Sequence, residues 1–276
     1  MSVIAQQVLL FEAPPRARRA LRFVVLGSGS KGNAVVVESG GRRILVDAGF
    51  SARELTRRLQ GVGLQPRDLD AIVLTHEHGD HVRGVSALAR KHHLAVYGTA
   101  GTLSRVRWRG SEERYEIRSG TPFAIADLEI EAFDVPHDAR EPVGLVIADP
   151  SGGRLGVAGD LGCRSRLAWA RLRGCHALLL ETNHDLEMLR NGPYPWPLKQ
   201  RVAGRHGHLS NADAVQGLEE LVHDDLQLVV GYHLSETNNR PSLVAALVGE
   251  ELDRLRCSAE VVLSAQSLGT GWLEVR

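Results

Sequence analysis

The sequence predicts an α/β fold in which two sheets are covered by helices, and two observations predict it. Residues 21–160 contain several short runs of aliphatic and β-branched residues that end at Gly, Asp or His. Residues 177–265 then alternate such runs with helical patterns. Two mixed halves of this kind fit a single domain whose layers follow the order helix, sheet, sheet, helix.

The first half supplies most of the expected strands. They cover residues 21–27, 33–39, 42–49, 71–76, 123–136, 144–149 and 154–160. Gly40 and Gly41 separate two of these runs and indicate a hairpin turn. One helix is expected over residues 51–61, where Ser51 can cap the first turn, and another over residues 80–91.

The second half repeats this mixture of elements. Strands are expected over residues 177–182, 226–233 and 259–265, and helices over residues 211–223 and 241–256. Residues 191–197 are rich in Gly and Pro and are expected to form a loop.

Composition and charge limit the classes of protein to which the chain can belong. The 276 residues include 33 basic and 33 acidic side chains, which excludes a uniformly basic nucleic-acid coat but leaves room for a local cationic site. No apolar run approaches the roughly 20 residues that span a bilayer. The three cysteines are odd in number and lack CxxC spacing, which favours a reducing compartment, so a cytoplasmic location is expected.

The chain is expected to form one folded domain over residues 21–276, preceded by a flexible N-terminal arm over residues 1–20. This arm lacks the positive and apolar regions of a secretory signal. No heptad pattern indicates a particular oligomeric state.

The densest group of chemically active side chains lies in residues 75–81, THEHGDH, directly after the apolar run AIVL. His76 and His78 are two residues apart, so an extended turn can direct both at one metal ion. Asp80 and His81 follow where a helix would begin, and they can face a second ion. Imidazole is a common zinc ligand, and carboxylate helps to hold a borderline or hard divalent metal.

Three further candidate ligands follow other predicted strands. His137 lies after FDVP, Asp160 ends RLGVAGD and His233 ends LQLVVGYH. Side chains in these positions can converge on one rim of the fold, and a carboxylate such as that of Asp160 can bridge two ions. The shared position therefore predicts a metal site with two ions.

The glycine-rich segment 27–32, GSGSKG, fits the pattern GxGxxG, and Asp47 lies about 20 residues further on. A dinucleotide site requires a helix after this pattern, whereas AVVVE follows here and predicts a strand. We therefore expect no dinucleotide cofactor and assign the segment to a tight turn beside the metal cleft.

The motif GHLSN, residues 207–211, precedes a predicted helix. Ser210 can cap that helix, with Asp213 three residues later. His208 then lies just before a helix N-terminus, where free backbone N–H groups favour an anion such as phosphate. Lys199 and Arg201 precede the motif closely and are candidates for phosphate contacts.

These motifs resemble the metallo-β-lactamase superfamily in type and in order: Asp47 in VDAG, the HxHxDH run, His137, Asp160 in AGD and His233 in GYHLS. GSGSKGN, ETNHD, GPYP and GHLSN are similar to the YycJ/WalJ branch of bacterial exonucleases. The resemblance covers about residues 22–275 and implies a four-layer αββα sandwich.

The resemblance also implies roles for individual residues. It assigns His76, His78 and His137 to one divalent ion, Zn²⁺ or Mn²⁺, and Asp80, His81 and His233 to the other. Asp160 is expected to bridge the two ions, and Asp47 to orient the ligand loop from behind. His208 is expected to act as the proton donor or to contact phosphate, as in similar tRNA-processing relatives, and Asp80 to orient the attacking hydroxide as well as to bind metal. The remaining expected substrate-binding residues are Asn183, His184, Lys199, Arg201, Ser210 and Asn211.

The expected function is metal-dependent hydrolysis of a phosphodiester by a metal-activated hydroxide, most specifically as a DNA or RNA exonuclease. One alternative is hydrolysis of a small substrate such as a cyclic phosphodiester, a thioester or a lactam. Another is a non-catalytic scaffold that binds nucleic acid. About two metal ions per chain favour an enzyme, and none favours the scaffold.

Overall fold

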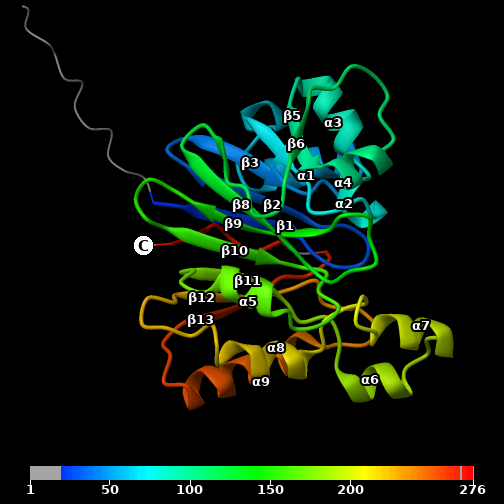
Figure 1. The fold of residues 1–276 in the computed structure, drawn as a ribbon, viewed down its shortest axis with the longest axis vertical. Helices are drawn as coiled ribbons and strands as arrows, with labels where there is room; N and C mark the ends of the chain where they lie inside the picture. The colour runs from blue at the N-terminus through cyan, green and yellow to red at the C-terminus, as the bar shows by residue number, and fades with distance from the viewer. Residues whose placement is uncertain (1–19, 268, 276) are drawn as a thin grey trace, which may run out of the picture.

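The computed structural model describes residues 20–267 and 269–275, and they form two stacked β-sheets with helices on both outer faces (Figure 1). The predicted four-layer α/β sandwich is confirmed. The predicted N-terminal arm over residues 1–20 lies outside the described residues except for Ala20. No helix among the described residues is long and apolar enough to cross a membrane.

The first sheet has seven described strands in the order β14-β1-β2-β3-β4-β5-β6. In chain order these are β1 (Arg22–Gly27), β2 (Ala34–Ser39), β3 (Arg42–Val46), β4 (Ala71–Val73), β5 (Ala95–Thr99), β6 (Arg114–Ile117) and β14 (Leu273–Glu274). Strands β3, β4, β5 and β6 are parallel to one another, whereas β1 and β2 form antiparallel pairs.

The second sheet also has seven described strands, in the order β13-β12-β11-β10-β9-β8-β7. In chain order these are β7 (Phe123–Ile125), β8 (Leu128–Asp134), β9 (Val143–Ala148), β10 (Arg154–Ala158), β11 (Ala177–Glu181), β12 (Leu228–Tyr232) and β13 (Glu260–Leu263). Strands β10 to β13 are parallel, and β8 points the same way because β9 runs antiparallel to both β8 and β10.

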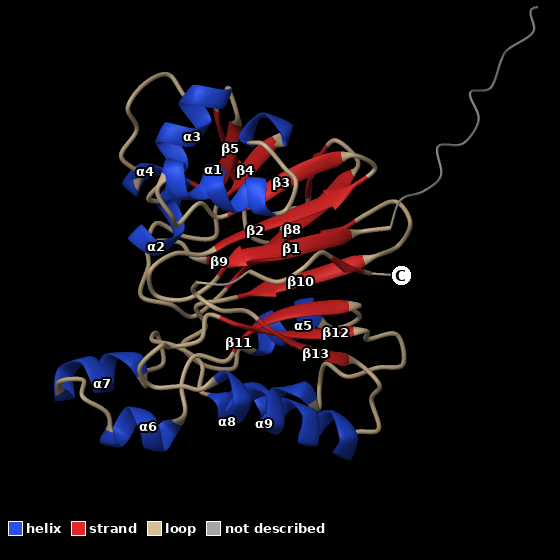
Figure 2. Cartoon of the chain, turned by 180° about the vertical axis from the view of Figure 1, so that it is seen from behind, coloured by secondary structure: helices blue, strands red, loops and turns tan. Residues whose placement is uncertain are grey.

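Helices α1, α3, α5, α8 and α9 pack on the outer faces of the two sheets, and Figure 2 shows them from the other side. In chain order the helices are α1 (Ala52–Gly61), the 3-10 helix η1 (Pro66–Asp68), α2 (Gly79–Val82), α3 (Val85–His92), α4 (Ala100–Arg105), α5 (Arg166–Leu172), α6 (Leu186–Asn191), α7 (Trp196–Val202), α8 (Asn211–Leu218) and α9 (Pro241–Arg254). Three apolar clusters fill the spaces between the layers: one between the sheets, one under α1 and α3, and one under α5, α8 and α9. Burying this much apolar surface stabilises the four layers against one another.

Local sequence signals set several element boundaries as predicted. Ser51 caps α1 by accepting a hydrogen bond from the backbone N of Glu54. The helix expected over residues 80–91 is instead two helices, α2 and α3, and that prediction is corrected. The helix is interrupted at Gly84. The N–H of Gly84 donates a hydrogen bond to the carbonyl of Ala48, and a Cβ at this position would clash with the carbonyl of Phe50.

The strand topology brings the expected site residues to one end of the sandwich. Strands β3 and β4 of one sheet and β8, β10, β11 and β12 of the other end at this edge. Helices α2 and α7 lie beside the same end in both views (Figures 1 and 2). Loops that leave the carboxyl ends of parallel strands are the usual place for a ligand site in α/β proteins.

Candidate metal centre

The loop after β4 supplies four of the expected ligands. His76 follows the end of β4 by three residues, and the chain then turns into α2, with His78 as the residue before the helix. The helix begins with a hydrogen bond from the N–H of His81 to the carbonyl of His78, and the carbonyl of Asp80 accepts a hydrogen bond from the N–H of Asn33. The GSGSKGN turn therefore packs against this ligand loop, as the sequence predicts.

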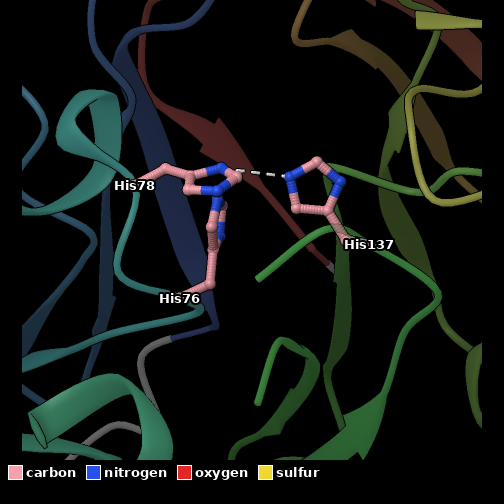
Figure 3. Close-up of side chains that lie close together, drawn as sticks. All are labelled: His76, His78 and His137. Carbon is pink, nitrogen blue, oxygen red and sulfur yellow. Dashed lines mark hydrogen bonds between the residues drawn. The ribbon is translucent and has the colours of Figure 1, made fainter. Parts of the chain in front are cut away.

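His76, His78 and His137 form the first cluster, in which one ring nitrogen from each lies within 4.8 Å of the others (Figure 3). Nδ1 of His78 lies 3.2 Å from Nε2 of His137. Nδ1 of His137 lies 2.9 Å from the carbonyl oxygen of Gly207, which leaves Nε2 directed toward the other two rings. Nε2 of His76 is buried and has no hydrogen-bond partner among the described residues. Three converging imidazoles, one with an unpartnered buried nitrogen, fit a divalent ion such as zinc.

Asp80, His81 and His233 form the second cluster. Oδ2 of Asp80 lies 3.7 Å from Nε2 of His81 and 3.4 Å from Nε2 of His233. Nδ1 of His81 and Nδ1 of His233 bind other carboxylates, so each ring presents its Nε2 to the cluster. This mixed set of one carboxylate and two imidazoles fits a second divalent ion.

Asp160 lies between the two clusters. Its Oδ2 is 3.1 Å from Nε2 of His81, and its Oδ1 is 3.6 Å from Nε2 of His233 and 3.8 Å from Nε2 of His137. It therefore reaches members of both clusters, as a bridging ligand requires. The structure thus brings together the seven side chains that the sequence predicts as ligands.

Three residues of the site have a left-handed backbone that non-glycine residues rarely adopt. The φ angles are 59° at Asp47, 54° at Asp160 and 55° at His233. Each residue comes one or two positions after a buried strand, and the left-handed turn directs its side chain to the common edge. Such strain, of order 1–3 kcal/mol per residue, is found preferentially at functional sites.

Asp47 holds the ligand loop from behind. Its carboxylate lies 2.8 Å from Nδ1 of His81 and accepts hydrogen bonds from the backbone N and the hydroxyl of Thr75. These contacts fix the orientation of the His81 ring and direct its Nε2 toward Asp160 and the amide of Asn33.

Burial and charge set the protonation of the site residues. Burial is the largest influence on His76 and His137, and it lowers the pKa of both, which favours the neutral imidazole that binds metal. Burial alone would raise the pKa of Asp160, but the charges of His233 and His81 outweigh it and hold that pKa well below its usual value. Burial likewise opposes the positive charge of His233, yet Asp160, Asp80 and Glu181 raise the pKa of His233 to about 10. The site therefore places neutral imidazoles at His76 and His137 and a protonated imidazole at His233 beside ionised carboxylates.

Glu181 is a site residue that the sequence reasoning missed. It ends β11, is fully buried, and forms a four-residue group with Asp160, His208 and His233. Its Oε1 lies 2.8 Å from Nδ1 of His208 and 3.2 Å from Nδ1 of His233, and its Oε2 accepts hydrogen bonds from two backbone N–H groups. A carboxylate at the end of the buried strand ALLLE was the signal, since the other site residues follow strands in the same way.

His208 lies ahead of α8, and Ser210 caps that helix as predicted. The His208 side chain is 20% exposed and lines the cleft over the clusters. Burial lowers its pKa, but the charge and hydrogen bond of Glu181 outweigh this and raise it above the ordinary value. Because Nδ1 is bound to Glu181, Nε2 is the atom free to exchange a proton in the cleft.

The other expected substrate-binding residues lie in different environments. Asn183 and Arg201 line the cleft, and Arg201 donates a 2.6 Å hydrogen bond to Asp138. Lys199 is outside the cleft lining and donates to the carbonyl of Arg190. Three further residues are buried and do not line the cleft: His184, Ser210 and Asn211. The side chain of Ser210 donates a hydrogen bond to Asp213, and that of Asn211 donates one to Asn239. Both ring nitrogens of His184 are buried and have no hydrogen-bond partner among the described residues.

Comparison with known proteins identifies the family. Residues 42–231 match the Beta-lactamase superfamily domain. The chain is 33% identical over 237 residues to exodeoxyribonuclease YycJ of Bacillus anthracis, covering 84% of this chain and 89% of that one. The chain belongs to the metallo-β-lactamase superfamily.

Within this superfamily the chain is similar to the YycJ/WalJ branch, as the sequence motifs predict. It is 34% identical over 226 residues to exodeoxyribonuclease WalJ of Streptococcus pneumoniae serotype 2, covering 79% of this chain and 83% of that one. The metallo-β-lactamase fold protein YhfI of Bacillus subtilis superposes with a TM-score of 0.68 at 17% identity, covering 91% of this chain and 99% of that one. The prediction that the chain is a metallo-hydrolase of this superfamily is confirmed.

Proposed function

We propose that the protein is a nucleic-acid exonuclease that hydrolyses phosphodiester bonds at a site for two divalent metal ions. The first ion would be held by His76, His78 and His137 and the second by Asp80, His81 and His233. Asp160 would bridge the two ions. Zn²⁺ or Mn²⁺ suits these nitrogen and oxygen ligands.

One observation carries this proposal: a protonatable histidine with its own buried carboxylate lies directly beside the two ligand clusters. Oδ1 of Asp160, the bridging residue, is 3.5 Å from Nδ1 of His208, and Glu181 is 2.8 Å from the same nitrogen. A metal site for the attacked phosphate and a proton donor for the leaving oxygen are the two parts that phosphodiester hydrolysis requires.

The charge of the site favours an anionic substrate. Two divalent ions would carry a charge of +4, and the carboxylates of Asp80 and Asp160 contribute a charge of −2. The negative charge of Glu181 is neutralised by the positive charge of a protonated His208. The bound ions would supply Lewis-acid stabilisation of the phosphate and of the attacking water. A cationic cleft floor in a chain with no net charge concentrates a phosphodiester at this one place.

Other residues of the site have positioning, proton-transfer or phosphate-binding roles. Glu181 keeps His208 protonated and fixes its ring, so that Nε2 can give a proton to the leaving oxygen. Asp47 holds His81, and Asn183 donates a 2.8 Å hydrogen bond to the carbonyl of His233, which orients the second cluster. Arg201 lines the cleft and donates a hydrogen bond to Asp138. When the guanidinium releases Asp138, it can contact a neighbouring phosphate of the substrate.

The nucleic-acid substrate is supported by the relatives. Both YycJ of B. anthracis and WalJ of S. pneumoniae are named exodeoxyribonucleases, and each aligns over more than three quarters of this chain. DNA is therefore the first substrate to test, and a cytoplasmic location remains our prediction.

The direct test is hydrolysis of end-labelled DNA and RNA oligonucleotides by the purified protein with Mn²⁺ or Zn²⁺. The matched control is the double variant His76→Ala, Asp80→Ala, which removes one ligand from each cluster. We expect metal-dependent release of terminal nucleotides by the native protein alone. Hydrolysis of cyclic phosphodiesters, thioesters or lactams without oligonucleotide cleavage would support a small-substrate hydrolase, and binding of DNA without metal or cleavage would support a scaffold.

A further inference from the structure

One wall of the cleft has a composition that the metal chemistry does not explain. The floor carries Asp80, Asp160, His208 and His233, whereas the wall is built from the α6–α7 segment. That segment contributes to the cleft an aromatic ring, two aliphatic side chains and a cation, namely Tyr194, Leu198, Val202 and Arg201.

The three α7 residues of this wall share one helix face, because positions 198, 201 and 202 are separated by three and four residues. Tyr194 precedes the helix in the motif GPYPWP, where prolines at 193 and 195 flank it. Proline fixes its own φ angle and restricts the residue before it to extended conformations. The prolines therefore restrict the backbone on both sides of Tyr194, which lowers the entropy cost of ordering this segment on binding.

Tyr194 has no visible role in stabilising the fold. It is half-buried and belongs to none of the three apolar clusters. Among the described residues it has no hydrogen bond, ion pair or ring contact. An aromatic ring that lies on a restricted backbone, lines the cleft and lacks an internal partner is suited to receive a flat ligand.

We propose that Tyr194, Leu198 and Arg201 form a nucleobase subsite, in which the base next to the scissile phosphate stacks on Tyr194 and packs on Leu198 while Arg201 contacts the adjoining phosphate. This inference rests on the proposed nuclease function and adds the substrate recognition that the metal centre lacks. Every base has a flat π-face, so such a subsite holds the strand end without reading its sequence. It also distinguishes a nucleic acid from a phosphodiester without a base.

The test compares two oligonucleotides that differ only at the nucleotide to be released, one with a normal base and one with an abasic tetrahydrofuran residue. We expect the native protein to cleave the base-containing strand with roughly ten-fold higher kcat/KM, mainly through KM, as aromatic stacking on a base predicts. Tyr194→Ala should reduce this preference to near one, and Tyr194→Phe should retain it because the ring remains.

Trp196→Ala is the matched control, since Trp196 lies two residues away, is 67% exposed and does not line the cleft. It should leave the preference unchanged. The subsite proposal fails if the native protein does not distinguish the two strands, if Tyr194→Ala keeps the preference, or if Tyr194→Phe loses as much as Tyr194→Ala. Failure of the proposed function looks different: the native protein would then cleave neither strand nor thymidine 5′-p-nitrophenyl phosphate.

Discussion

The floor and the α6–α7 wall of the cleft are built in opposite ways. The floor side chains follow buried strands or lie at the start of helices α2 and α8, and His208 and His233 each have a ring nitrogen within hydrogen-bond distance of Glu181. The wall comes from two short helices joined by a proline-rich turn, and Tyr194 and Trp196 there have no such partners among the described residues.

This difference separates chemistry from recognition. A site that binds metal must hold several ligands within fractions of an ångström, and the floor achieves this with burial, hydrogen bonds behind the ligands and left-handed backbone at Asp47, Asp160 and His233. Tyr194 in the wall belongs to none of the three apolar clusters. A substitution there can therefore change substrate preference with little effect on the stability of the fold. Substitutions in the floor should therefore abolish activity, and substitutions in the wall should adjust it.

The largest effect is expected at the centre of the floor. Asp160→Asn removes a carboxylate that reaches both clusters, so we expect fewer than two metal ions per chain and a fall in kcat on the order of 1,000-fold, since metal-ion stabilisation contributes several kcal/mol. Elemental analysis and oligonucleotide cleavage measure the two effects. Full metal content with native activity would contradict the bridging role.

Glu181→Gln should lower kcat roughly 100-fold while the metal content is retained, because general-acid catalysis contributes at least that factor. The dependence of kcat on pH reports the protonation of His208. Glu181 raises the pKa of His208, so its neutralisation should lower that pKa, and activity should be lost at a lower pH on the alkaline side. A substrate whose leaving group is p-nitrophenolate needs no proton, so its hydrolysis should fall far less. An equal loss on both substrates would rule out the proton-donor pathway.

Asp47→Asn should have a smaller effect that acts through the metal. Loss of the charge opposite Nδ1 of His81 weakens the orientation of one ligand, and changes of this kind cost about 10- to 100-fold in metal affinity. Titration with a competing chelator measures the affinity, and excess metal should restore most of the activity. Activity that stays low at saturating metal would indicate that Asp47 does more than position His81.

The smallest effect is expected on helix α7 outside the cleft lining, at Lys199→Ala. Lys199 donates one exposed hydrogen bond to the carbonyl of Arg190 and does not line the cleft. We expect a change in unfolding free energy within about 0.5 kcal/mol and near-native cleavage. A large rise in KM would show that Lys199 contacts the substrate, as the sequence alone suggests, and would extend the recognition wall beyond Tyr194.

The sequence predicts the floor well for a physical reason. Metal binding favours His and Asp at these positions, and the parallel topology favours positions at strand ends. Residue type and position after an apolar run can both be read from a short stretch of sequence. His137, Asp160 and His233 each follow a visible apolar run. The split between α2 and α3 was not predicted, because it depends on the contact of Gly84 with Ala48 from another part of the chain.

Glu181 and Tyr194 show where sequence reasoning ends. Glu181 is one carboxylate at the end of an apolar strand, and only the fold reveals that it lies against His208 and His233. Tyr194 lies more than one hundred residues after the HxHxDH loop, and its place in the cleft depends on how the α6–α7 segment packs over the floor. The strand end marks Glu181 as a candidate site residue, but both roles depend on long-range contacts.

Seven scattered side chains should hold two divalent ions in one pocket, and anomalous scattering from crystals grown with Zn²⁺ or Mn²⁺ will show whether they do. Two peaks about 3.5–4 Å apart are expected. One should lie within bonding distance of His76, His78 and His137 and the other within bonding distance of Asp80, His81 and His233, with Asp160 between them. A single peak, or peaks away from these residues, would contradict this assignment.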